Sequence, residues 1–225
     1  KVRLTGGEPF ARKGFADFLE RLRAAHPALD IRVTTNGTLI GPHIQTLKAI
    51  GLNAVNLSLD TFDRDKFEQI TGRDLFGKVR ENMDALLDAG IPFKLNAVAM
   101  RGFNDDELPA FIGYAMRRPI DVRFIELMPM GPCAGWPKAR FVPAETVLEA
   151  VPGLQPLRRD GVAELWHAPG WVGNVGLIRP MSHRFCDGCS RIRVTADGRL
   201  KPCLHSAAEI PLRGLHGEAL LAELR

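Results

Sequence analysis

Short runs of β-branched and other apolar residues alternate with helix-length amphipathic stretches through the first half of the chain, and this alternation constrains the fold most. The runs cover residues 2–5, 31–35, 54–59, 93–100 and 122–127, and the stretches between them cover residues 14–25, 42–50, 64–71, 75–89 and 105–116. Such alternation is typical of βαβ units with parallel strands. Five consecutive units with short loops favour a barrel or partial barrel over an open sheet. We therefore predict an α/β fold built as a partial TIM-like barrel.

Polar residues follow the predicted strands, where a βα barrel carries its functional groups. They are Thr-Gly-Gly-Glu at 5–8, Thr-Thr-Asn-Gly at 34–37, Ser-Leu-Asp at 58–60, Asn96, and Glu-Leu-Met at 126–128. Gly51, Gly72 and Gly90 stand where helix C-caps belong, and Pro42 suits a first helical turn. The sequence therefore predicts a functional site at the carboxyl ends of the strands.

The pattern changes at about residue 129, where Pro and Gly become frequent. Short strands are predicted over residues 163–167, 173–178 and 191–196. Asp197-Gly198 between residues 192–195 and 199–202 is a hairpin signal. We predict a barrel over residues 1–128 and a C-terminal extension over residues 129–225 that carries a metal site and covers the barrel.

Three of the four cysteines are clustered in the sequence: Cys186, Cys189 and Cys203 form Cys-x2-Cys-x13-Cys. Three thiolates can hold a metal centre and leave one metal position without a cysteine ligand. The spacing alone leaves two centres open: an iron–sulfur cluster, or a zinc site completed by His183 or His205. Cys133 has no partner in the sequence, and we interpret it as an incidental loop cysteine.

The net charge of +4 is mild and suits either a solvated surface or a basic pocket for phosphates. Arg191 and Arg193 alternate along a predicted strand, so they would share one face beside the open metal position. That arrangement suits an anionic substrate. No nucleic-acid motif accompanies the three tryptophans, which we interpret as packing residues.

We expect a cytoplasmic protein that is not embedded in a membrane, because no signal peptide and no apolar run of about 18 residues is present. Clustered cysteines also suit a reducing compartment. The chain begins within a predicted strand and ends within a helical pattern. We therefore expect it to be a fragment of a longer protein.

Taken together, the motifs resemble those of the GTP 3′,8-cyclase family, radical S-adenosylmethionine enzymes of molybdenum-cofactor biosynthesis. The resemblance covers essentially the whole chain and is strongest at residues 3–9, 31–37, 56–60, 123–128 and 185–203. It implies a partial (β/α)6 barrel of the radical S-adenosylmethionine type with two 4Fe–4S clusters at opposite ends. The sequence departs from the family where the N-terminal Cys-x3-Cys-x2-Cys and the C-terminal Gly-Gly tail would stand.

The resemblance also implies roles for individual residues. Those of the S-adenosylmethionine site are Gly7, Ser58 and Met128, with Glu8 near the methionyl amine. The GTP contacts would be Arg3, Thr34, Lys94, Arg191 and Arg193. The second 4Fe–4S cluster would be held by Cys186, Cys189 and Cys203, with its open iron facing guanine. No residue is identified as a general acid or base.

From the residues alone, three of these basic side chains have other interpretations. Lys94 could extend from a strand start to solvent, and Arg3 could form a surface salt bridge. Arg123 could belong to the site or could pair with Glu126. These alternatives remain open at the level of the sequence.

The implied activity is that of a lyase that converts GTP to 3′,8-cyclo-7,8-dihydro-GTP. One electron would cleave S-adenosylmethionine, and the resulting 5′-deoxyadenosyl radical would remove hydrogen from C3′ of GTP, after which C3′ attacks C8. The implied partners are GTP, an electron donor that the sequence does not identify, and the pterin synthase that acts next; a homodimer is compatible with the resemblance. Two other interpretations stay open: a peptide-modifying radical enzyme with an auxiliary cluster, and a non-catalytic βα module with structural zinc.

Overall fold

The computed structural model describes residues 1–136, 138–186 and 189–224, and within them one curved sheet organises most of the chain. Its strands, in spatial order, are β1 (Val2–Leu4), β2 (Ile31–Thr35), β3 (Ala54–Ser58), β4 (Phe93–Ala99), β5 (Asp121–Glu126), β8 (Asn174–Ile178), β7 (Ala163–His167) and β6 (Gln155–Asp160). The first six run parallel, and β7 and β6 are antiparallel additions. The predicted partial barrel is confirmed.

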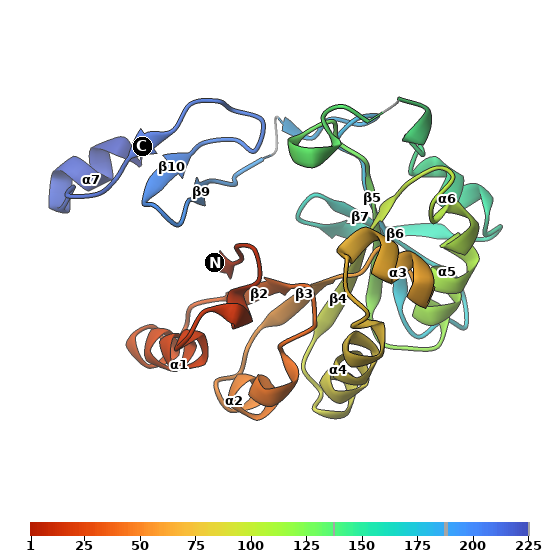
Figure 1. Cartoon of the computed structure of the whole chain (residues 1–225), viewed down its shortest axis with the longest axis horizontal. Coiled ribbons are helices and arrows are strands. Elements are labelled where there is room, and N and C mark those ends of the chain that lie inside the picture. The colour runs from red at the N-terminus through yellow and green to blue at the C-terminus, as the bar shows by residue number, and fades with distance from the viewer. Residues whose placement is uncertain (137, 187–188, 225) are drawn as a thin grey trace.

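Helices connect the parallel strands and pack against one face of the sheet (Figure 1). They are α1 (Phe15–Ala25), α2 (Ile44–Ala49), α3 (Arg64–Thr71), α4 (Phe76–Asp88), α5 (Leu108–Met116) and α6 (Glu145–Glu149), with 3-10 turns at Pro9–Ala11, Gly41–His43, Asp105–Glu107, Gly131–Cys133 and Lys138–Arg140. Gly51, Gly72 and Gly90 all adopt positive φ at or just after helix ends, as predicted.

The two faces of the sheet differ sharply because side chains alternate along each strand. Residues 31, 33 and 35 of β2 are buried while 32 and 34 are partly exposed, and β4 follows the same alternation over residues 93–99. The buried set packs on the helices and forms the main hydrophobic core, which includes Val33, Leu57, Leu95, Val122 and Leu177. The other face is polar and carries the candidate site.

A buried carboxylate joins the end of β5 to the segment that follows β8. Glu126 is only 1% exposed, and its Oε2 accepts hydrogen bonds from the backbone N–H groups of Met181 and Ser182, both at 2.9 Å. Its Oε1 accepts from Ser182 Oγ at 2.5 Å. Glu126 therefore fixes the start of the segment that leads to Cys186.

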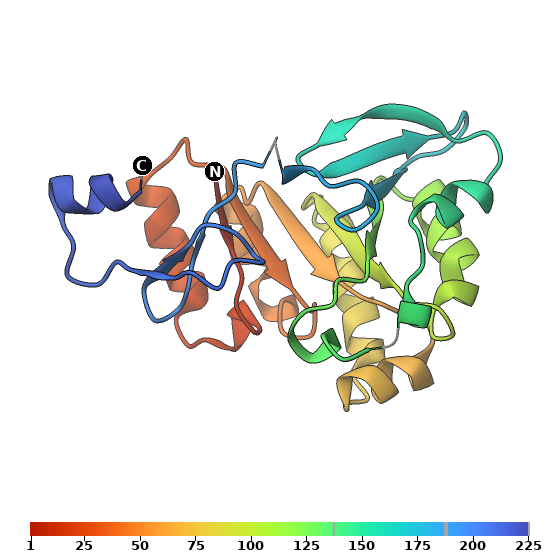
Figure 2. The same cartoon turned by 90° about the horizontal axis from the view of Figure 1, so that it is seen from above.

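The C-terminal segment forms a small separate sheet of β9 (Arg193–Val194), β10 (Arg199–Lys201) and β11 (Ile210–Pro211), followed by α7 (Gly217–Glu223). The predicted hairpin is confirmed, since β9 and β10 pair antiparallel around Asp197-Gly198. The strand predicted over 191–196 is shorter because its partner β10 has only three residues. Figures 1 and 2 both place this segment on the side of the molecule where β1 lies.

The domain boundary at residue 128 remains a prediction. The strands β6, β7 and β8 all come after it, yet they extend the same sheet as β1–β5. Among the described residues, none of the helices combines the length and apolar character that a bilayer crossing needs.

Candidate functional site

A continuous row of polar side chains crosses the helix-free face of the sheet. Strand register places Thr34 beside Asn56, Asn56 beside Lys94, and Lys94 beside Asp121. One step along, Asn96 lies beside Arg123, and Arg123 lies beside Gly176. A methyl group at Gly176 would lie 2.8 Å from Arg123 Cγ, so the glycine leaves room for the arginine.

Two of these cations share the carboxylate of Asp160, which lies at the end of β6. Lys94 Nζ and Arg123 Nη2 both form salt bridges with Asp160 Oδ2, the latter at 2.5 Å. Both also approach Asp121 Oδ2, at 3.7 and 3.3 Å. The side chains of Lys94 and Arg123 are 16% and 6% exposed, so these ion pairs are largely shielded from water.

Burial alone would raise the pKa of Asp160, but the hydrogen bond from Lys94 and the charge of Arg123 outweigh it and hold that pKa well below its usual range. Burial lowers the pKa of Lys94, and the nearby Arg123 adds to this, although the bond to Asp160 opposes both. Asp160 is therefore ionised at neutral pH and serves as a counter-charge for the two cations.

Arg3 and Arg191 extend this group toward the C-terminal segment. Arg3 is exposed, yet desolvation by its surroundings lowers its pKa, and the neighbouring charges of Arg32, Arg191 and Arg123 lower it further. The pKa of Arg191 responds in the same way to burial and to Arg193 and Arg123, while Cys189 opposes the change. Arg32 differs because its guanidinium pairs with both oxygens of Asp30, at 2.8 and 3.0 Å. We call Arg3, Lys94, Arg123 and Arg191 the cationic cluster.

Several buried polar atoms on this face have no hydrogen-bond partner within the described part of the chain. They include Asn56 Oδ1, Asn96 Oδ1 and Arg123 Nε. Buried polar atoms are normally satisfied, so these three are suited to bind water or a ligand. With the cationic cluster beside them, the face can bind an anion and hydrogen-bond to its neutral parts.

The residues predicted for S-adenosylmethionine lie at or just after strand ends. Ser58 is exposed at the end of β3, Met128 is half-buried after β5, and Gly7 is exposed after β1. Glu8 already accepts several hydrogen bonds within the chain, which its motif does not indicate. Its carboxylate accepts from Thr35 Oγ1 at 2.8 Å, from Asn36 N at 2.8 Å and from Phe10 N at 3.2 Å. It therefore joins the ends of β1 and β2, and about one of its four acceptor positions remains for a ligand.

The three cysteines are free and exposed, and Cys189 N donates to Cys186 O at 3.0 Å, so these two residues lie close together. Cys203 follows β10 on the other side of the hairpin. Over the described ranges, no three His, Cys, Asp or Glu side chains are gathered closely enough to hold a metal ion. As a donor set, three free thiols fit an iron–sulfur cluster.

His183, one candidate fourth ligand of a zinc site, lies beside Glu145 and Ser182 at 3.3 and 3.2 Å. Cys133 is half-buried, and its backbone N–H donates to the carbonyl oxygen of Met130. Its role remains the predicted one of a loop residue.

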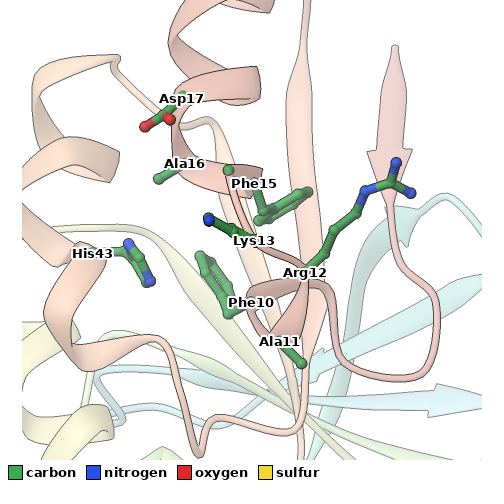
Figure 3. A pocket seen from close by; sticks show the side chains of 9 residues that line it. Phe10, Ala11, Arg12, Lys13, Phe15, Ala16, Asp17 and His43 are labelled. Carbon is green, nitrogen blue, oxygen red and sulfur yellow. The ribbon is translucent and has the colours of Figure 1, made fainter.

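A separate hollow of about 240 Å³ lies on the helical side of the sheet (Figure 3). Phe10, Phe15 and His43 line it, and the His43 ring stacks on Phe10 with 5.2 Å between centroids. It shares no lining residue with the polar face, and we assign it no part in the site.

The structure adds residues that sequence reasoning missed. Arg32, Asn56, Asp121 and Asp160 all join the polar face. Strand alternation could have indicated the first three, since they lie in phase with Thr34, Ser58 and Arg123 on their own strands. The suggested pairing of Arg123 with Glu126 is wrong: Arg123 pairs with Asp121 and Asp160, because residues 123 and 126 point to opposite faces.

The fold and the motifs together define a class of protein. Residues 1–115 match the radical SAM superfamily, and residues 120–223 match the family described as Molybdenum Cofactor Synthesis C. Among solved structures, Streptococcus suis SuiB bound to S-adenosylmethionine covers 100% of this chain and 56% of its own, with a TM-score of 0.61 at 13% identity. The match to a domain of pyruvate-formate lyase-activating enzyme from Bacteroides vulgatus covers 66% of this chain and 88% of that domain, with a TM-score of 0.52 at 14% identity. The chain has a radical S-adenosylmethionine fold, and that superfamily uses a 4Fe–4S cluster with S-adenosylmethionine.

Curated relatives narrow the class to one family. GTP 3′,8-cyclases of Alkaliphilus oremlandii and Alkaliphilus metalliredigens are 44% and 45% identical over 215 residues, which is 94% of this chain and 67% of theirs. The enzyme of Peptoclostridium acidaminophilum is 43% identical over 219 residues. The chain belongs to the GTP 3′,8-cyclase family and spans about two thirds of the length of these relatives.

Proposed function

We propose that this chain is the major part of a GTP 3′,8-cyclase, a radical S-adenosylmethionine lyase that converts GTP to 3′,8-cyclo-7,8-dihydro-GTP in the first step of molybdopterin biosynthesis. The family membership supports the reaction. The observation that carries the assignment in this chain is the cationic cluster beside unpartnered buried amide oxygens on one face of the sheet. The cationic cluster suits the negative charges of a triphosphate. The amide oxygens can accept hydrogen bonds from the sugar and the base.

In this proposal the cluster and Arg193 bind the triphosphate. Arginine offers paired N–H donors that match phosphate oxygens, and Lys94 supplies a point charge. Thr34 would donate its hydroxyl to GTP from β2, next to Asn56. Charge-assisted contacts of this kind orient GTP and hold it away from bulk water, which is the main contribution that a protein makes to radical chemistry.

Gly7, Glu8, Ser58 and Met128 would bind S-adenosylmethionine at the carboxyl ends of the strands. The chemistry that this cofactor supplies when bound is the removal of a hydrogen atom from the ribose. Glu8 would use its remaining acceptor position for the methionyl ammonium group. Its bonds to Thr35 and Asn36 keep the carboxylate oriented.

Cys186, Cys189 and Cys203 would hold the second 4Fe–4S cluster, which supplies an iron position free of cysteine for the guanine base. An electron donor, the pterin synthase that consumes the product and a second copy of the chain are further proposed partners. A cytoplasmic location would suit a cluster of this kind, because oxygen and an oxidising compartment would damage it.

The test uses the full-length protein, purified without oxygen. We expect Arg191→Ala and Arg193→Ala to reduce GTP turnover by about 10- to 150-fold while the iron content stays unchanged. Cys189→Ser should remove iron of the second cluster and activity together. Arg199→Ala is the matched control, because Arg199 lies on the same hairpin, is exposed and pairs with Asp197 at 3.0 Å.

Arginine variants that lose iron as severely as Cys189→Ser would show that these residues support the fold of the segment. Variants that keep both iron and normal GTP turnover would remove the phosphate role. Zinc in place of iron and sulfide in the anaerobic protein would contradict the cluster itself.

A further inference from the structure

The tip of the β6–β7 hairpin places a carboxylate of the chain itself inside the cationic cluster. The hairpin turns through Gly161 and Val162, because Asp160 pairs with Ala163 in the register. Asp160 reaches Lys94 on β4 and Arg123 on β5, although β6 is the outermost strand of the sheet. A methyl group at Gly161 would lie 3.5 Å from Arg191 Nη2, so the tip also touches the cluster from its other side.

We propose that Asp160 occupies the position of an anionic group of the substrate, and that a phosphate of a nucleoside triphosphate displaces this carboxylate from Lys94 and Arg123 when it binds. The identity of the ligand rests on the proposed function, whereas the displacement follows from the geometry. Largely buried cations need a counter-charge before any ligand arrives, and Asp160 supplies it. Asp121 is a weaker counter-charge for Lys94 and Arg123 than Asp160 is, because its Oδ1 already accepts a hydrogen bond from Asn174 at 2.8 Å.

The hairpin can yield this position at low cost to the core. Residues 155–159 of β6 are exposed, and β6 has a neighbouring strand on one side only. Its pairing with β7 is irregular between Pro156 and Arg158. A small movement on the β6 side of the tip therefore disturbs few packed side chains, while Ala163 on the β7 side is fully buried.

Displacement also gives Asp160 a part in specificity. A singly charged anion that replaced it would exchange one negative charge for another and gain little. A polyphosphate brings several charges, which Arg3 and Arg191 are placed to share with Lys94 and Arg123. The carboxylate would therefore weaken the binding of small anions more effectively than that of a triphosphate.

The experiment measures affinity by calorimetry in the full-length protein, with tripolyphosphate and GTP as separate ligands. We expect Asp160→Asn to bind both about tenfold more tightly than the unaltered protein, since the competing charge is gone. Asp197→Asn is the matched control, because Asp197 also stands before a glycine in a hairpin turn and pairs with an arginine at 3.0 Å. It should leave both affinities unchanged.

Unchanged or weaker binding of tripolyphosphate by Asp160→Asn would overturn the inference and would mean that Asp160 stays in place and orients the cations. The thermal midpoint guards against a folding defect: tripolyphosphate should raise it more in Asp160→Asn than in the unaltered protein. If Asp160→Asn binds more tightly but the unaltered enzyme never turns over GTP, the displacement stands and the proposed function fails. If the unaltered enzyme turns over GTP but Asp160→Asn gains no affinity, the proposed function stands and the displacement fails.

Discussion

Single buried charges do much of the organising on the polar side of this molecule. Glu126 is the clearest case, because one carboxylate accepts three hydrogen bonds from Met181 and Ser182. Bonds to a charged acceptor are worth about 1.5–3 kcal/mol each, and buried donors left without one carry a further penalty. The path of the chain toward Cys186 therefore depends on one side chain on β5.

Glu126→Ala should lower the free energy of unfolding by about 3 kcal/mol, because it leaves the part-buried N–H donors of Met181 and Ser182 and the buried N–H of Ala144 without an acceptor. Glu126→Gln should cost less, since one amide oxygen remains. Urea denaturation would measure both, with Glu20→Gln on the exposed side of α1 as the control. Equal stability of Glu126→Ala and the unaltered chain would show that water replaces the carboxylate.

Asp160 should make stability depend on acid. Its pKa lies well below the usual value in the folded chain, so its contribution is complete above the unfolded pKa of about 4 and is lost as the pH falls further. We expect the thermal midpoint of Asp160→Asn to fall less steeply than that of the unaltered chain below pH 4. Parallel curves would show that Asp160 gains nothing from its cations.

The sequence and its family resemblance predicted most residues of the candidate site, and those that were missed have a physical reason. Arg3 and Arg191 lie near each other and near Arg123, which shares Asp160 with Lys94; their roles as ligand contacts stay predictions. Asp160 escaped because its contacts join residues 37 and 66 positions apart, and no local pattern carries that information. The roles predicted for Gly7, Ser58 and Met128 stay predictions.

At the scale of elements, the parallel strands and their helices were predictable because strong hydrophobic periodicity marks them. The strand β6 was not, since its sequence Gln-Pro-Leu-Arg-Arg-Asp has no alternation and contains a proline. It is a strand only because β7 offers a partner edge. Tertiary pairing decides such a segment, and propensity does not.

Close packing between β5, β7 and β8 depends on Gly176, which has no side chain. A methyl group at Gly176 would meet Arg123 at 2.8 Å and Leu165 at 3.1 Å. We expect Gly176→Ala to destabilise the fold by about 1–3 kcal/mol and to weaken anion binding, because Arg123 must move.

Gly77→Ala is the control for this prediction. Gly77 lies exposed in α4 with no atom within 4 Å of an added methyl, so alanine there should stabilise by about 0.5–1 kcal/mol. Chemical denaturation of the two variants gives the comparison. A neutral Gly176→Ala would show that Arg123 has room to shift.

For the molecule as a whole, the 225-residue polypeptide should take up a single 4Fe–4S cluster on reconstitution without oxygen. It has one cysteine triad, and Cys133 lies apart from it in the sequence, so about four irons per chain are expected. It should not cleave S-adenosylmethionine, since no second triad is present to deliver the electron. Iron and sulfide analysis checks the first point, and chromatography of 5′-deoxyadenosine checks the second. Eight irons per chain would contradict the single cluster, and detectable 5′-deoxyadenosine would contradict the absence of cleavage.

The opposition of the two sheet faces implies that this protein tolerates changes of residue far better than changes of length. Removing Leu95 alone would turn every later residue of β4 over, sending the amide of Asn96 toward the helices and Ala97 and Ala99 toward the polar face. In a deletion scan we expect single-codon losses inside β2–β5 to abolish soluble expression, while losses in the exposed stretch at 152–153 survive. In related sequences, substitutions should therefore be accepted within the strands, whereas insertions and deletions should be confined to the loops between elements.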